Sequence, residues 1–130
     1  MTVPSSDEQE LENWFFENIS TDKKQVFKKF EMTISVMQDA DSIRRVAYEA
    51  VEDLVEDGVV YGELRYAPLQ HLQGKLSSQE VVDAVSIGIK DGQKDFGGEF
   101  YTILCAMRQH KNSTEVAELA IKNFNNKVIG

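Results

Sequence analysis

The sequence predicts an α/β fold in which helices cover a parallel sheet. Two stretches rich in β-branched and aromatic residues, 59–66 and 100–107, alternate with longer segments of helical periodicity, and a third such stretch begins at 127–130. Alternation of strands and helices implies parallel strands joined by right-handed crossovers, and parallel strands need cover on both faces. Because two strands and the start of a third do not supply that cover, we expect a piece of a larger α/β domain.

The first 40 residues predict two helices. Ser6 opens a capping-box pattern that closes at Gln9, and apolar residues then recur at helical spacing as far as Ile19. The run Ser20–Asp22 is expected to start a second helix, with apolar residues on one side. Its other side, which we interpret as a solvated face, carries Lys23, Lys24, Lys28 and Lys29.

The clearest helical pattern covers residues 43–55, where apolar side chains repeat every three or four positions. Asp41 or Ser42 is expected to cap its start, and Gly58 supplies the left-handed residue that ends many helices. The strand 59–66 follows and ends before Pro68.

A second capping box at residues 77–80 starts a helix that is predicted to continue to about Phe96. Gly88 and Gly92 lie one turn apart within it. Each glycine costs about 1 kcal/mol of helix stability relative to alanine, so we expect a close backbone contact there. After the strand 100–107, Asn112 is expected to cap the last helix.

Composition excludes several classes of protein. The chain has 130 residues, a net charge of −8 and 42% hydrophobic residues, which suit a packed domain and disfavour nucleic-acid binding and polybasic membrane anchoring. No apolar run approaches the roughly 18 residues of a membrane span. The first residues lack the pattern of a signal peptide, and Cys105 is the sole cysteine, so we expect a cytoplasmic protein without disulfides.

The strand 59–66 carries charges on one face. Glu63 and Arg65 share a face by the period-two alternation, and Leu64 and Tyr66 share the other. One interpretation is an internal ion-pair network that positions the strands. The other is that this face looks into the mouth of a barrel or a sheet crevice. Both suit an enzyme scaffold.

The two histidines, His71 and His110, show no metal-ligand spacing, because neither has a second histidine or cysteine nearby. Each follows a predicted strand, where active sites gather, although ordinary loop histidines are the simpler interpretation. Cys105 is interpreted as a structural thiol. Met107, with the same parity, either belongs to the core or packs a ligand at the end of its strand.

Several motifs strongly resemble those of adenosine deaminases, in the order expected for that family. They are Arg44–Glu49, Val51–Asp53, Asp57–Pro68, Val81–Val85 and Ile103–Arg108. The resemblance implies a partial (β/α)8 barrel of the TIM type. It implies one segment, 1–130, with a helical lid region at 1–40 and early β/α units of the barrel at 41–130.

The resemblance implies zinc-dependent hydrolysis of adenosine or deoxyadenosine to inosine or deoxyinosine and ammonia, with zinc activating the attacking water. The family's His-x-His motif is expected before Met1, and its His-Ala-Gly-Glu motif after Gly130. We therefore expect no catalytic residue and no metal ligand in this chain. The chain alone is predicted to bind no zinc and to be inactive.

The resemblance also assigns roles to individual residues. Those matching positions that contact the purine nucleoside substrate are Phe27, Phe30 and Met107, the first two in the lid. Arg65 and Arg108 match family arginines that we interpret as structural, and Glu63 is interpreted as structural with them.

Two other functions remain open. The chain could be a non-catalytic binding or assembly module, or one half of a split deaminase completed by a second polypeptide. In each case exposed strand edges require cover, so we expect self-association or association with the rest of the barrel.

Overall fold

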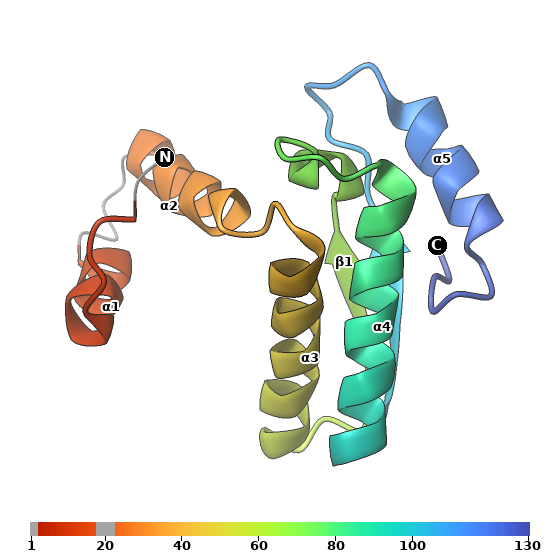
Figure 1. Cartoon of the computed structure of the whole chain (residues 1–130), viewed down its shortest axis with the longest axis horizontal. Coiled ribbons are helices and arrows are strands. Elements are labelled where there is room, and N and C mark those ends of the chain that lie inside the picture. The colour runs from red at the N-terminus through yellow and green to blue at the C-terminus, as the bar shows by residue number, and fades with distance from the viewer. Residues whose placement is uncertain (1–2, 18–22) are drawn as a thin grey trace. The chain divides into compact units, whose positions relative to one another are not determined.

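The computed structural model describes residues 3–17 and 23–130 (Figure 1). The chain divides into two compact units, residues 1–36 and residues 37–130, and each is described by itself. The predicted α/β class is confirmed, because the described residues form five α-helices, a short 3-10 helix and a parallel sheet of two strands.

The first unit contains helices α1 (Glu8–Phe16) and α2 (Lys23–Ser35). Helix α1 begins where the Asp7 carboxylate accepts a hydrogen bond from the Glu10 backbone N–H at 2.9 Å. The prediction that Ser6 caps this helix is therefore wrong. The predicted start of the second helix, Ser20–Asp22, lies outside the described residues.

Lys29 links the two helices of the first unit. Its ammonium group donates to the backbone carbonyls of Phe15, at 2.6 Å, and Glu17, at 2.8 Å. It also lies 5.8 Å from the centroid of the Trp14 ring. Carbonyls at a helix C-terminus lack partners within the helix, and the helix dipole favours a cation there. Lys29 thus caps α1 and is not part of a purely solvated face.

The second unit is built around a parallel strand pair. Strands β1 (Tyr61–Tyr66) and β2 (Glu99–Leu104) are in register, with Tyr61 opposite Glu99 and Tyr66 opposite Leu104. Val128 forms a parallel bridge to Thr102, so a further strand begins where the sequence predicts one. The helices of this unit are α3 (Ala40–Glu56), the 3-10 helix η1 (Pro68–His71), α4 (Ser78–Phe96) and α5 (Ser113–Lys122).

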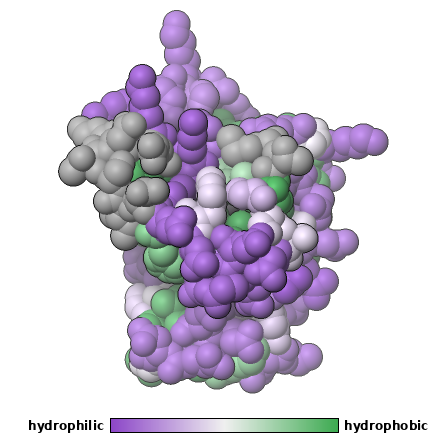
Figure 2. Space-filling model, turned by 90° about the vertical axis from the view of Figure 1, so that its left-hand side faces the viewer, coloured by the Kyte–Doolittle hydropathy of each residue, from purple (hydrophilic) through white to green (hydrophobic). Residues whose placement is uncertain are grey.

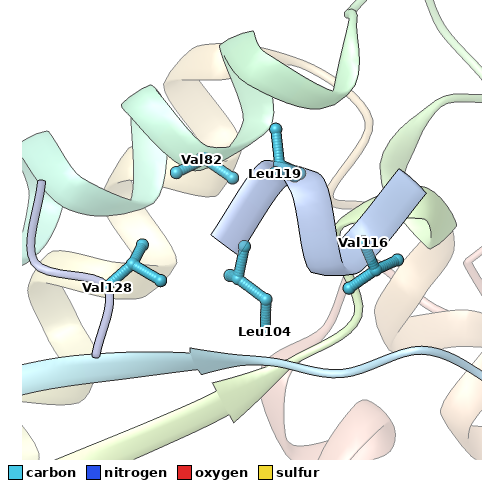
Figure 3. Packing of buried hydrophobic residues seen from close by; sticks show 5 residues of the cluster. All are labelled: Val82, Leu104, Val116, Leu119 and Val128. Carbon is cyan, nitrogen blue, oxygen red and sulfur yellow. The ribbon is translucent and has the colours of Figure 1, made fainter. Parts of the chain in front are cut away.

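Helices α3 and α4 lie side by side along one face of the sheet (Figure 1). Beneath them Ala47 and Val51 of α3, Ile89 of α4 and Phe100 of β2 form a buried cluster. A second cluster joins α4 and α5 to the end of β2 and to the start of the next strand. Its side chains point toward one another in Figure 3 and are Val82, Leu104, Val116, Leu119 and Val128.

The predicted close contact at the glycines of α4 is confirmed. A Cβ atom at Gly88 would lie 2.3 Å from the carbonyl oxygen of Arg44 and 2.8 Å from Cβ of Ala47. A Cβ at Gly92 would lie 2.8 Å from Cβ of Val51. All three distances are shorter than a Cβ atom tolerates, so α3 packs on α4 at a separation that only glycine permits.

Two predicted helix ends are confirmed. The Ser77 hydroxyl accepts from the Glu80 N–H at 3.3 Å, and the Glu80 carboxylate accepts from the Ser77 N–H at 2.8 Å, which completes a capping box. Gly58, after the last turn of α3, has a φ of 87°, in the left-handed region.

Three predicted boundaries are corrected. Asp39 caps α3 in place of Asp41 or Ser42, because its carboxylate accepts from the Ser42 N–H at 2.9 Å. Asn112 precedes α5 without a side-chain capping bond. Strand β2 ends at Leu104 and not at residue 107, because its partner strand β1 has already ended before Pro68.

Polar side chains of α4 hold the segment that follows α5. The Ser86 hydroxyl donates to the Asn126 carbonyl at 2.7 Å, and the Asn126 amide donates to the Asp83 carboxylate at 3.1 Å. The Lys90 ammonium donates to the side-chain oxygen of Asn126 at 2.8 Å. These bonds fix the turn immediately before the third strand.

The surface is largely polar on the face that Figure 2 draws. Figure 2 shows a face that is mainly hydrophilic, with smaller areas of hydrophobic side chains. In the part of the chain that the structure describes, no helix is both long enough and apolar enough to cross a membrane.

The glycine contact leads to a stability prediction. We expect Gly88→Ala to lower the free energy of unfolding by about 2 kcal/mol, although alanine is the better helix former, because overpacking typically costs about 1–3 kcal/mol. Chemical denaturation followed by circular dichroism measures this change. Lys94→Ala, at an exposed position of the same helix, is the control and should change stability by less than about 0.5 kcal/mol. A stabilised Gly88→Ala variant would show that the helices can separate without cost.

Candidate functional site

The residues that follow the two strands meet at the carboxyl edge of the sheet. The Cys105 N–H donates to the Tyr66 carbonyl at 2.9 Å, so the segments after β1 and β2 leave the sheet side by side. Enzymes built on parallel sheets place their sites at this edge, where loops can vary without disturbing the core. This edge is therefore the candidate functional site.

Met107 lines a small apolar hollow at this edge. The hollow has a volume of about 10 Å³, the space of about one water molecule. Met107 is half-buried, and Arg108 beside it is exposed. The residues that line the hollow are Ala67, Leu69, Cys105, Ala106, Met107, His110, Asn112, Ser113 and Val116.

A larger hollow, of about 540 Å³, lies on the outer surface of α3 and α4. Its charged groups largely satisfy one another. Arg44 pairs with Asp91 at 2.6 Å, and the Tyr48 hydroxyl donates to the Asp95 carboxylate at 3.0 Å. Solvent-exposed pairs of this kind stabilise weakly, and we interpret this surface as a solvated helix face.

The charged face of β1 has the predicted alternation. Tyr61, Glu63 and Arg65 are exposed, and the residues between them face the helices. The Tyr61 hydroxyl donates to the Glu63 carboxylate at 2.8 Å, which raises the pKa of Tyr61 because the bond requires the protonated phenol. Both ion pairs among the described residues lie on the helices, and neither involves Glu63 or Arg65.

Strand β2 extends this exposed face. The Tyr101 ring lies 6.0 Å from that of Tyr61, and the Tyr101 hydroxyl donates to the Glu99 carboxylate. The Lys127 ammonium lies 4.6 Å from the centroid of the Tyr101 ring. The uncovered face of the sheet is thus aromatic and charged, with each tyrosine hydroxyl bonded to a carboxylate.

His71 is a buried residue of the turn that follows β1. Its Nδ1 atom lies 2.8 Å from the carbonyl oxygen of Met37, and because a carbonyl only accepts, Nδ1 carries the hydrogen. Burial lowers the pKa of His71, although the hydrogen bond to Met37 acts in the opposite direction. The folded chain therefore favours the neutral ring.

Sequence reasoning missed the partner of this turn. The Gln38 side-chain amide donates to the Gln70 carbonyl at 3.0 Å, and its oxygen accepts from the Gln73 N–H at 2.9 Å. No local pattern signals these contacts, because the bonded residues lie more than 30 positions apart.

A second polar group that the sequence did not reveal is the Tyr66 hydroxyl. It is buried and has no hydrogen-bond partner among the described residues. Burial raises the pKa of Tyr66, and the nearby charge of Asp83 acts in the same direction.

Phe27 and Phe30 lie on α2, within the first unit. Both side chains are largely exposed, by 63% and 61%.

The described residues offer no set of side chains that could bind a metal ion. Residues 3–17 and 23–130 contain no group of three or more His, Cys, Asp or Glu side chains that could hold a metal ion. The Nδ1 atom of His71 is hydrogen-bonded to the Met37 carbonyl, and His110 is exposed. Zinc needs three or four such donors, so these residues do not fit it and no catalytic step is assigned to a metal here.

Comparison with known proteins decides the family. The family model described as adenosine deaminase matches residues 1–130. The chain belongs to the adenosine deaminase family. The resemblance seen in the sequence is thereby confirmed.

Individual adenosine deaminases agree with this assignment. The chain is 40% identical to the adenosine deaminase of Mycobacterium avium over 134 residues, which cover 98% of the chain and 37% of that protein. It is 40% identical to adenosine deaminase 1 of Streptomyces coelicolor, over 98% of the chain and 34% of that protein. The adenosine deaminase of Mycolicibacterium vanbaalenii is 47% identical over 106 residues, 78% of the chain and 29% of that protein. The chain thus spans about a third of the length of these adenosine deaminases.

The buried histidine leads to a prediction about pH. We expect the free energy of unfolding to fall as the pH drops below about 6.5, because the unfolded histidine then takes up a proton before the folded one does. The contribution is complete above the unfolded pKa and is lost as the pH falls through the lowered folded pKa. Denaturation at a series of pH values measures it.

His71→Asn keeps a donor near the Nδ1 position but does not titrate, so this part of the pH dependence should disappear. The matched control His110→Asn, at an exposed position, should leave the dependence as it is. An unchanged profile in His71→Asn would assign the pH dependence to other groups.

Proposed function

We propose that the chain is part of an enzyme that hydrolyses adenosine or deoxyadenosine to inosine or deoxyinosine and ammonia. The observation that carries this proposal is 40% identity, over 98% of the chain, to relatives named adenosine deaminase. The net charge of −8 supports a free nucleoside in preference to nucleic acid as the substrate, and we expect a cytoplasmic enzyme.

We infer that the second unit is the early part of a (β/α)8 barrel. Parallel strands, the crossover helix α4 between them and the start of a third strand support this inference. The exposed face that carries Tyr61, Glu63 and Arg65 would then point into the barrel. Glu63, Arg65 and Arg108 are proposed to serve the structure of the barrel, with residues 1–40 as its helical lid and residues 41–130 as its early β/α units.

Substrate contacts are proposed for three residues. Phe27 and Phe30 would cover the nucleoside from the lid, and their exposure leaves their rings available for that contact. Met107 would lie near the purine, at the carboxyl edge of the sheet. The zinc ion implied by the resemblance would be held by residues other than those described, and the chain alone is proposed to be inactive.

A second candidate, an assembly module or one half of a split deaminase, is favoured by the uncovered sheet face. An exposed strand pair that carries aromatic side chains on its open face requires a cover. That cover would come from the rest of the barrel, from a second polypeptide or from another copy of the chain.

A complementation assay tests these proposals. Ammonia release from adenosine is measured for the purified chain, and for the chain combined with a polypeptide that supplies the remaining length of its relatives. We expect no release from the chain alone, and release that is sensitive to chelators from the combination. Turnover by the chain alone would contradict its proposed insufficiency, and an inactive but stable complex would favour the assembly module.

The lid proposal predicts a matched pair of variants. In the combined enzyme, Phe30→Ala is expected to lower kcat/KM about tenfold, mainly through KM, because loss of roughly 1.4 kcal/mol of apolar contact corresponds to a factor of ten. Phe16→Ala is the control, since Phe16 is a phenylalanine of α1 with a similar exposure of 68%. Equal effects of the two substitutions would contradict a specific contact of Phe30 with the substrate.

A further inference from the structure

We propose that His71 and Gln38 are positioning residues that hold the segment Met37–Asp39 on the turn after β1. Any change in the orientation of the first unit then involves backbone rotation at or before Val36, and not at Met37–Asp39. This inference goes beyond the proposed activity and does not depend on it. It rests on contacts inside the second unit, whose boundary falls between Val36 and Met37.

Hydrogen bonds tie two consecutive residues to one turn. The His71 ring donates to the Met37 carbonyl at 2.8 Å. The Gln38 side chain donates to Gln70 at 3.0 Å and accepts from Gln73 at 2.9 Å. Gln38 thus uses both ends of its amide, and all of these partners come from the same short segment of chain.

Backbone packing supports the same attachment of Met37 and Gln38 to the turn after β1, which we call the tie. A Cβ atom at Gly74 would lie 2.5 Å from the carbonyl oxygen of Gln38, so the two backbones approach at a distance that only glycine permits. The Met37 side chain packs against the buried cluster of Ile43, Val81 and Ala84. The tie therefore combines hydrogen bonds, backbone contact and apolar burial.

The residue after Gln38 is held by hydrogen bonds to the first turn of α3. Asp39 caps α3, accepting from the N–H and the hydroxyl of Ser42 at 2.9 and 2.7 Å. Every residue from Met37 to Asp39 thus has a partner in the second unit. Val36, directly before them, lies outside the last turn of α2 with 49% of its surface exposed.

The tie matters because the turn after β1 lies beside the candidate site. Helix η1 starts two residues after β1 ends, at the carboxyl edge where the candidate site lies. The first unit therefore joins the second at a point that is bonded to the loop beside the site.

Backbone NMR of the full chain tests this inference. The residue-resolved readouts are the fast motion of the Met37 and Gln38 amides, by heteronuclear NOE, and hydrogen exchange at Gln73, whose N–H bonds to Gln38. In the parent chain we expect Met37 and Gln38 to be as rigid as α3. His71→Leu, which removes the donor, should make both residues mobile and accelerate exchange at Gln73 at least tenfold.

Conservative and control variants separate this local release from general destabilisation. Exchange at Cys105, whose N–H bonds to Tyr66, should remain that of the parent in His71→Leu. His71→Asn, which keeps a donor, should restore the parent behaviour, and His110→Leu should match the parent.

Three results would overturn the inference: mobile Met37 and Gln38 in the parent, an unaltered His71→Leu variant, or a His71→Asn variant that behaves like His71→Leu. If His71→Leu does not fold, Gln38→Ala replaces it, with Gln109→Ala at an exposed position as its control. Mobility of Met37 in Gln38→Ala supports the tie, and unchanged rigidity of Met37 refutes it.

Discussion

The close packing of α3 on α4 is the constraint on which the second unit depends. Gly88 and Gly92 each lower helix stability by about 1 kcal/mol relative to alanine. Because they carry no side chain, the two helix axes approach until side chains of α3 touch the backbone of α4. Because α3 precedes β1 and α4 follows it, the packing of these two helices determines where β1 begins and where the chain enters β2. Phe100 of β2 is then buried beneath both helices.

The candidate site inherits its geometry from this packing. Once α4 is fixed, its polar side chains hold Asn126 and therefore the start of the third strand, while its N-terminal end holds the turn that contains His71. The turn after β1, at the carboxyl edge of the sheet, thus rests on α4. A site that needs side chains from several strand ends is best supported in this way, because its loops are then held by packed helices and strands.

Local patterns predicted the helices and strands, and contacts distant in sequence determined what they missed. The helix 43–55 and the capping box at Ser77 follow from periodicity and short-range hydrogen bonds, which a single sequence displays. The start of α3 does not, because Asp39, Asp41 and Ser42 can each serve as the cap and the choice depends on where the preceding segment is held. The end of β2 likewise depends on where its partner β1 ends. Lys29 and His71 act on carbonyls 14 and 34 residues away, which no window of sequence can reveal. The substrate contacts proposed for Phe27 and Phe30 came from resemblance alone, and for Met107 the strand pattern left a core position and a ligand contact open.

The exposed face of the sheet holds its carboxylates in hydrogen bonds within single strands. Burying a carboxylate is costly unless it is hydrogen-bonded, and a buried phenol also needs a partner. On this face Glu63 and Glu99 already accept hydrogen bonds from Tyr61 and Tyr101, each two residues away on the same strand. These bonds do not require any other strand, so they would persist if further strands or another polypeptide covered the face. Covering the face would then bury two carboxylates and two phenol groups that are already hydrogen-bonded to one another, which reduces the desolvation penalty of these four groups.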